Sequence, residues 1–227
     1  MTGLRLAWLL VCSVVALASP ALAQTPAFPD HSVRIIVGFP PGGATDVIAR
    51  LLAQGLTTEL GQTVLIENKG GASGIIGSEL VVKAAPDGYT LLFAPSSHAT
   101  LPALYPTLSF DPIRDFTPIA TVARTPYILV AYPGLEIKTV AELLAMARAK
   151  PNSLAYASTG MGTAQHLAGE VLQRTAKVEI LHVPYKGSGA VRADLLAGRI
   201  QTMFDNVAVR CSTSPARCCA VPMPVEA

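Results

Sequence analysis

Short runs of β-branched and apolar residues alternate with helix-like patterns along most of the chain. A strand, a glycine-containing loop and a helix, repeated in this order, predict an α/β fold with mostly parallel sheets. We expect strands at 33–39, 64–68, 90–94, 154–157, 178–183 and 200–204. Apolar residues at helical spacing predict helices over 45–60 and 139–150. Three more helices are expected after glycine-rich loops: from the loop at 70–74 to about residue 85, from the loop at 158–163 to about 174, and from the loop at 186–189 to about 196.

The middle of the chain interrupts this alternation. Residues 101–116 contain three prolines and little periodicity, which favours a crossing segment. The pattern then restarts with expected strands at 116–123 and 127–132. We therefore expect two lobes, the first over residues 24–104 and the second over 105–209.

One helix carries a clear start signal. Thr139 can accept a hydrogen bond from the first turn, and Glu142 follows three residues later. This pair predicts a capping box, in which each side chain bonds the backbone N–H near the other.

The first 23 residues have the parts of a secretory signal peptide. A positively charged start at 1–5 precedes an apolar run at 6–18, and Ala21 and Ala23 supply the small residues of a cleavage site. We expect cleavage after Ala23 and export. The apolar run is too short to span a bilayer, which favours a signal peptide over a membrane anchor. No later segment approaches 18 uninterrupted apolar residues, so we expect no membrane span after cleavage.

Residues 210–227 differ from the rest of the chain. Cys211, Cys218 and Cys219 lie there, whereas residues 24–210 contain no cysteine. An odd cysteine count is unusual in an exported protein. A disordered natural terminus or a translated wrong reading frame would give such a segment, and we expect the second, an aberrant tail over 210–227.

The charge balance excludes two classes of protein. Charged residues make up 14% of the chain, apolar residues 51%, and the formal net charge is +2. Intrinsic disorder requires the opposite balance of charge and hydrophobicity. A protein that binds nucleic acid electrostatically needs a basic face, which this chain lacks, so we expect no nucleic-acid partner.

Four expected loops between a strand and a helix are rich in glycine and small polar residues. They lie at 40–46, 70–74, 158–163 and 186–189. In a parallel sheet such loops gather at the carboxyl ends of the strands, where α/β folds bind ligands. Helix N-termini offer unpaired N–H groups and partial positive charge, so a small anion is the expected ligand. The alternative is that these glycines serve only as ordinary helix entries.

The known motifs of nucleotide, metal and hydrolase sites are missing. The sequence has no phosphate-binding P-loop, no complete dinucleotide fingerprint and no zinc-ligand spacing among its four histidines, so we expect no cofactor and no metal. Adjacent Ser97 and His98 leave a hydrolase as an alternative, although no nucleophile-elbow motif accompanies them.

Eight segments within residues 28–209 occur in the order of a known family: 33–46, 67–74, 86–91, 97–99, 115–119, 157–163, 182–187 and 203–205. Together they resemble the extracytoplasmic solute receptors of the tripartite tricarboxylate transporters (Bug or TctC-like receptors). The resemblance implies a two-lobed, type II periplasmic-binding-protein-like fold without catalysis. It also implies a periplasmic receptor that captures a small organic carboxylate (a di- or tricarboxylate, an amino acid or an aromatic acid) for membrane permease subunits.

The resemblance also implies a set of ligand-binding residues. The first loop would contribute Pro41, Gly42, Gly43 and Asp46, the corresponding loop of the other lobe would contribute Ser158, Thr159, Gly162 and Thr163, and Ser97 and Asp205 would line the same cleft. The family pattern ends after Ala208 or Val209, where members continue with strands and a long helix that return to the first lobe. A frameshift or early stop would leave the first lobe incomplete, so a non-functional fragment is the alternative to a working receptor.

Overall fold

The computed structural model describes residues 27–206 and 219–220. The predicted signal peptide and most of the predicted tail lie outside the described residues. The described residues from His31 onward form one compact unit. Its strands make two sheets, with the orders β2-β1-β3 and β6-β5-β7-β4-β8.

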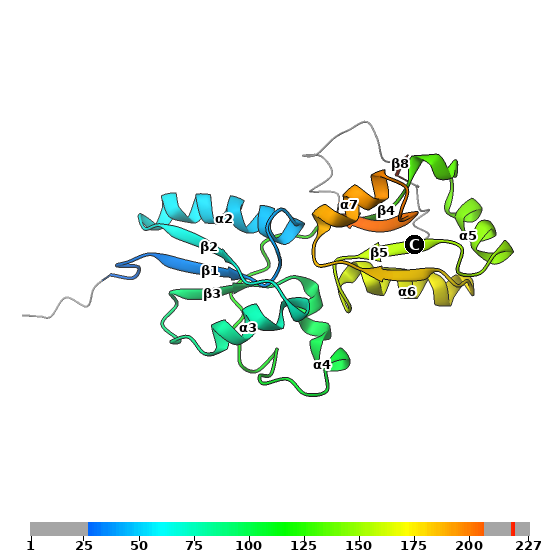
Figure 1. Cartoon of the computed structure of the whole chain (residues 1–227). Helices are drawn as coiled ribbons and strands as arrows, with labels where there is room; N and C mark the ends of the chain where they lie inside the picture. The colour runs from blue at the N-terminus through cyan, green and yellow to red at the C-terminus, as the bar shows by residue number, and fades with distance from the viewer. Residues whose placement is uncertain (1–26, 207–218, 221–227) are drawn as a thin grey trace, which may run out of the picture. The chain divides into compact units, whose positions relative to one another are not determined.

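The first sheet is entirely parallel. It contains β1 (Val33–Val37), β2 (Val64–Asn68) and β3 (Thr90–Phe93). Helix α2 (Ala44–Leu60) covers one face and α3 (Ile75–Val82) the other (Figure 1). Val33 and Ile35 of β1 pack against Ala53 of α2, so burial on both faces explains the nearly continuous apolar run of this strand.

Short helices and a turn complete the first group of elements. Gly61 ends α2 in the left-handed conformation, with φ 65°. The 3₁₀ helices η1 (Ala72–Gly74) and η2 (Ser96–Thr100) precede α3 and the short helix α4 (Leu101–Leu104).

The second sheet is mixed. Its strands are β4 (Tyr127–Ala131), β5 (Ala155–Ser158), β6 (Leu181–Pro184), β7 (Thr202–Asn206) and β8 (Cys219–Ala220). β5 pairs in parallel with β6 and β7, whereas β4 pairs antiparallel with β7 and β8. The predicted α/β fold with mostly parallel sheets is therefore confirmed, and the strands before residue 104 and after residue 126 belong to different sheets.

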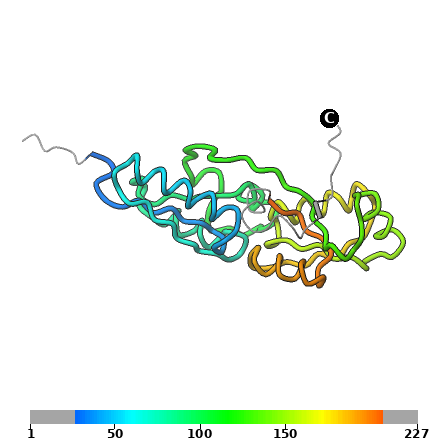
Figure 2. Tube along the Cα trace, turned by 90° about the horizontal axis from the view of Figure 1, so that it is seen from above, coloured from blue at the N-terminus to red at the C-terminus, as the bar shows by residue number. Residues whose placement is uncertain are grey.

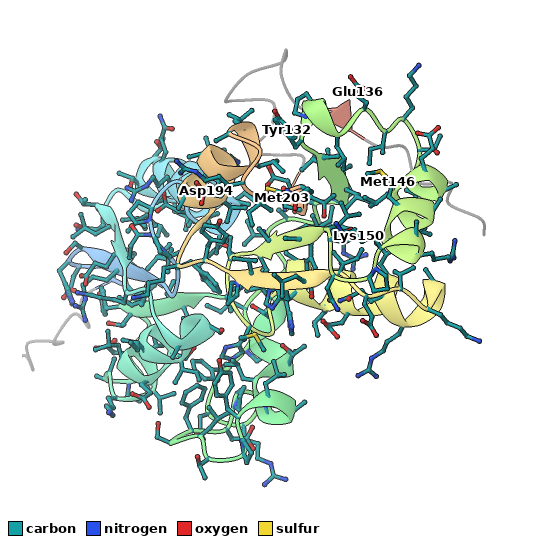
Figure 3. The ribbon with its side chains drawn as sticks, turned by 45° about the vertical axis from the view of Figure 1, so that its right-hand side comes forward. Tyr132, Glu136, Met146, Lys150, Asp194 and Met203 are labelled. Atoms are coloured by element: carbon teal, nitrogen blue, oxygen red, sulfur yellow. The ribbon has the colours of Figure 1, made fainter. Side chains whose placement is uncertain are left out.

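Helices cover both faces of the second sheet. Helices α5 (Val140–Ala149) and α6 (Ala164–Ala176) pack on one face, and α7 (Ser188–Leu196) packs on the other (Figure 1). The 3₁₀ helix η3 (Pro133–Leu135) leads from β4 towards α5. Met203 is fully buried beneath α7, and Tyr132 packs at the border of the same cluster (Figure 3). The predicted capping box of α5 is present, since the Thr139 hydroxyl accepts from the Glu142 N–H at 3.2 Å.

The predicted strand at 116–123 is wrong. Residues 117–126 have no strand or helix and lead into β4 as one extended segment (Figure 2). Ile119 is 77% exposed, and Pro118 lacks the N–H that a ladder needs. A short apolar run forms a strand only where a neighbouring strand can pair with it, and here none does within the described residues.

Candidate functional site

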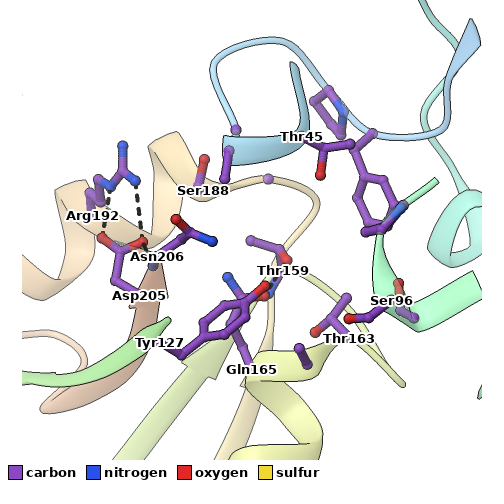
Figure 4. A pocket seen from close by; sticks show the side chains of 18 residues that line it. Thr45, Ser96, Tyr127, Thr159, Thr163, Gln165, Ser188, Arg192, Asp205 and Asn206 are labelled. Atoms are coloured by element: carbon purple, nitrogen blue, oxygen red, sulfur yellow. Dashed lines mark hydrogen bonds and ion pairs between the residues drawn. The ribbon is translucent and has the colours of Figure 1, made fainter. Parts of the chain in front are cut away.

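Three helices begin at one pocket. Gly43, Ala44 and Thr45 come from the start of α2; Thr163, Ala164 and Gln165 from the start of α6; Gly187 and Ser188 from the start of α7 (Figure 4). Most of the other lining residues lie near strand ends: Phe39, Pro40, Pro95, Ser96, Ser97, Thr159, Asp205, Asn206 and Tyr127. Arg192 reaches the pocket from the second turn of α7. The pocket therefore occupies the carboxyl ends of the parallel strands β1, β3, β5, β6 and β7, where α/β folds bind ligands.

Backbone amides at the starts of α2 and α6 have no hydrogen-bond acceptor within their helices. The first backbone bond of α2 runs from the Val47 N–H to the Gly43 carbonyl, and that of α6 from the Leu167 N–H to the Thr163 carbonyl, both 3.0 Å long. The amides of Ala44, Thr45, Ala164 and Gln165 precede these bonds and have no acceptor within their own helices. No acidic residue lies in the first turn of α6 or α7, so the positive ends of these two helices are not neutralised there.

Asp46 lies beside the pocket lining, in the first turn of α2. It is 3% exposed, and its carboxylate accepts bonds from the Gly42 N–H at 2.9 Å, Arg50 at 3.1 Å and Asn68 at 2.8 Å. Burial alone would raise the pKa of Asp46, but these donors together with the Arg50 charge hold it below its usual value. Asp46 therefore ties the loop at Gly42 to β2 and is not among the residues lining the pocket.

The Asp46 contacts predict a pH dependence of stability. The folded pKa of Asp46 lies below the unfolded value of 3.8, so the stabilisation is complete above pH 3.8 and is lost as the pH falls through the folded pKa. Asp46→Asn should lower the free energy of unfolding at pH 7 by about 1–2 kcal/mol, because charge-assisted hydrogen bonds are lost. The variant should then lose less stability than the wild type between pH 7 and pH 3, as measured by urea unfolding. Glu59→Gln, at an exposed position near the end of the same helix, is the control; an equal acid loss in Asp46→Asn and wild type would contradict this role.

Arg192 and Asp205 are the charged residues among those lining the pocket. The guanidinium donates to both carboxylate oxygens, from Nε at 3.3 Å and Nη2 at 3.2 Å (Figure 4). The Asn206 N–H adds a bond of 2.8 Å to Asp205, which is 6% exposed. The pair has no net charge, so the pocket lining contains no unpaired cation, and its positive features are the starts of α6 and α7.

The structure brings together half of the residues predicted to bind ligand. Gly43, Ser97, Thr159, Thr163 and Asp205 line the pocket. Pro41, Gly42, Asp46, Ser158 and Gly162 are not among the lining residues. Four of them support the lining turns: Gly42 donates to Asp46, Ser158 accepts from Gly160, and Gly162 donates to His166. Ligand binding by all ten residues stays a prediction.

Several polar lining residues were missed by sequence reasoning. Tyr127, Gln165, Arg192 and Asn206 line the pocket, and Gln165 accepts a hydrogen bond from the Thr159 hydroxyl. Ser188 had a signal, because it lies in the glycine-rich loop at 186–189. Arg192 and Tyr127 had none, because they reach the pocket from the second turn of a helix and from the start of an antiparallel strand.

The two ring nitrogens of His98 do not contact Ser97. Its Nδ1 lies 3.4 Å from the Ser78 hydroxyl and its Nε2 lies 3.0 Å from the Pro112 carbonyl. The ring also packs edge-on against Phe116 at 4.9 Å. Both ring nitrogens therefore have partners other than Ser97, and the hydrolase alternative lacks its general base.

Two features are absent from the described part of the chain, residues 27–206 and 219–220. Within it, no group of three His, Cys, Asp or Glu side chains could hold a metal ion. Across the same residues, no helix combines the length and the apolar character needed to cross a membrane.

The fold is that of the periplasmic binding proteins, because it matches solved structures described as a periplasmic transporter and as the periplasmic binding protein BugD. The family description "Tripartite tricarboxylate transporter family receptor" (TctC) matches residues 48–214. The chain belongs to this family, whose members are receptors rather than enzymes.

Curated relatives agree with the family match. A UPF0065 protein from the tcbD-tcbE intergenic region of Pseudomonas sp. (strain P51) is 41% identical over 181 residues, covering 80% of this chain and 54% of that protein. Protein BugT of Bordetella pertussis is 38% identical over 197 residues, covering 86% of this chain and 60% of BugT. The chain thus spans between 54% and 60% of the length of these two relatives.

Two solved structures contain organic acids. The R. palustris protein Rpa4515 with adipate is 39% identical, with a TM-score of 0.77, and the match covers 80% of this chain and 61% of that one. MatC from Rhodopseudomonas palustris with bound malate is 32% identical, with a TM-score of 0.73, and the match covers 82% of this chain and 63% of MatC.

Proposed function

We propose that this protein is a periplasmic receptor that binds a small organic acid, with one carboxylate at the starts of α2, α6 and α7. The observation that carries the proposal is the meeting of these three helix starts at one pocket that also contains hydroxyl groups. Backbone N–H groups and hydroxyls are donors, and they match the acceptor oxygens of a carboxylate. Adipate and malate in two similar proteins support this ligand class.

The neutral Arg192–Asp205 pair supports the same proposal. Because Asp205 already occupies two guanidinium donors, the pocket need not hold an isolated buried charge when it is empty. The remaining guanidinium N–H groups could still donate to a second polar group of the ligand. A small acid with a polar group at each end therefore fits the donors that the pocket offers.

Binding by the purified chain tests the proposal directly. We expect adipate or malate to raise the melting temperature and to give a saturable calorimetric titration. Adipamide is the matched control, since it has the length of adipate but no charge, and it should give neither signal. If neither acid binds, or if adipamide binds as tightly as adipate, the proposed function fails.

Delivery to a transporter and the cell compartment extend this proposal. Membrane permease subunits are the proposed partner because the chain belongs to a family of transporter receptors. A periplasmic location agrees with that membership and with the signal peptide predicted from the sequence. Release of bound acid on addition of permease-containing vesicles, but not of protein-free vesicles, would be the expected result.

A further inference from the structure

Beneath the pocket, two histidines hold the turn that leads into α6. This turn, residues 159–162, lies between β5 and α6 and is named here the β5–α6 turn. Thr159 within the turn and Thr163 directly after it line the pocket, so the conformation of the turn determines where the start of α6 lies. Ser73 and Thr100 bond its outer side, with hydroxyls 2.6 Å from the Met161 carbonyl and 3.2 Å from the Gly162 carbonyl.

His166 bonds the inner side of the turn. The Gly162 N–H donates to the His166 Nδ1 at 3.1 Å, and His166 is 8% exposed. A ring nitrogen that accepts a hydrogen bond carries no proton, so neutral His166 must hold its proton on Nε2. A second proton can then arrive only at Nδ1, the atom that Gly162 uses as an acceptor.

The titratable groups that face His166 come from three elements. Glu170 of α6 lies 3.9 Å from the Nε2 of His166, His182 of β6 lies with its ring centre 4.4 Å away, and Tyr156 of β5 donates to Glu170 at 2.9 Å. Glu170 favours a proton on His166, whereas a protonated His182 would oppose it. Burial, followed by the neighbouring His166, holds the pKa of His182 below its usual value, and Glu170 acts against this shift.

His182 can accept a proton without breaking its own contact. Its Nε2 lies 2.7 Å from the hydroxyl of Ser158, which is fully buried and accepts the Gly160 N–H at 3.2 Å. A hydroxyl can accept from a protonated ring nitrogen and still donate to a carbonyl, such as that of Gly160 at 3.1 Å. The two histidines therefore differ, and only His166 loses a bond to the turn when it is protonated.

We propose that His166 is a positioning residue for ligand binding, which holds the β5–α6 turn through Gly162 while neutral and releases it when protonated, so that affinity falls on acidification. The proposal rests on the proposed function, because it assumes that the pocket binds an acid. Histidine is the side chain whose charge ordinarily changes between pH 5 and pH 8, which sets the range to examine.

The test compares wild type with His166→Asn by calorimetry with malate between pH 5.5 and pH 8. Wild type should bind about tenfold more weakly at pH 5.5 than at pH 8, the size of one hydrogen bond lost. His166→Asn should bind within about threefold of wild type at pH 8 and lose at least threefold less affinity on acidification. The amide oxygen of the introduced asparagine takes the position of the His166 Nδ1 and can accept from the Gly162 N–H, but the amide does not take up a proton in this pH range. Titration of malate itself is common to all variants and cancels in the comparison.

Two control variants separate this role from a structural one. His166→Ala removes the acceptor and should bind weakly at every pH, with the same flattened profile as His166→Asn. His31→Gln, at an exposed position before β1, should keep the wild-type profile. A His166→Asn profile as steep as that of wild type would overturn the proposal.

A measurement without ligand distinguishes this proposal from the proposed function. In nitrogen-15 NMR of the histidines, His166 should be the Nε2–H tautomer at pH 8, and the Gly162 amide should lose protection from hydrogen exchange as His166 titrates. These signals are expected whether or not malate binds. An Nδ1–H tautomer, or a Gly162 amide insensitive to that titration, would contradict the role of His166 even if malate binds well.

Discussion

Gly43→Val is expected to weaken binding of adipate or malate by about 100-fold or more, while the chain stays folded. Gly43 precedes α2 with φ −81° and ψ 167°, a conformation that any residue can adopt. A Cβ there would meet the Ser188 Oγ at 3.7 Å and the Pro40 carbonyl at 3.8 Å, which are ordinary contacts. The two methyl groups of valine would then extend into the pocket that Gly43 lines with Ala44 and Ser188.

Stability and binding should separate in this experiment. Valine is a poor residue before a helix, so the free energy of unfolding should fall by about 1 kcal/mol, far too little to unfold the chain. Gly55→Ala in the middle of α2 is the control, because nothing lies within 4 Å of its added Cβ and binding should not change. Calorimetry and urea unfolding give the two quantities, and an affinity within threefold of wild type for Gly43→Val would rule out this edge of the pocket as the ligand site.

Arg192→Met should lower the free energy of unfolding by about 2–3 kcal/mol and should also weaken acid binding. The change leaves the Asp205 carboxylate buried without its cation, and the lining then has a net negative charge. The Arg192 side chain is 20% exposed, so water can replace part of the lost interaction, which places the effect at the lower end for a broken buried pair.

The double variant Arg192→Met/Asp205→Asn distinguishes two roles for the arginine. If Arg192 acts mainly by neutralising Asp205, removing both charges should recover most of the stability and most of the affinity. If the arginine holds the ligand directly, stability should recover while affinity stays low. A double-mutant cycle in urea measures the coupling energy of the pair, and additive effects of the two single changes would contradict the pairing described above.

Local signals predicted most of the elements correctly. The apolar runs at 33–39 and 64–68 correspond to β1 and β2, and Thr139 with Glu142 begins α5 as expected. These features depend on neighbours a few residues away, so the sequence pattern contains them. The run at 116–123 has a similar pattern and forms no strand, because pairing requires a partner that the local pattern does not specify.

Some residues of the candidate site had a local sequence signal and others did not. Glycine and hydroxyl residues before the helices indicated Gly43, Thr159 and Thr163, since a loop between a parallel strand and its helix always lies at the carboxyl end of the strand. Nothing local indicated Arg192 as the partner of Asp205. One belongs to α7 and the other to β7, and their contact depends on how that helix packs on the sheet.

By itself, the sequence determined the class of fold and indicated three of the loops that line the pocket, because strand runs, helix starts and glycine loops are properties of short segments. The fourth predicted loop, at 70–74, is not among the lining residues. Only the tertiary structure decided which side chains meet. The order β6-β5-β7 places His182 beside Ser158 and, with α6 packed against β5, brings His166 under the same turn. Sheet order and helix packing result from the burial of whole faces, and no short stretch of sequence contains that information.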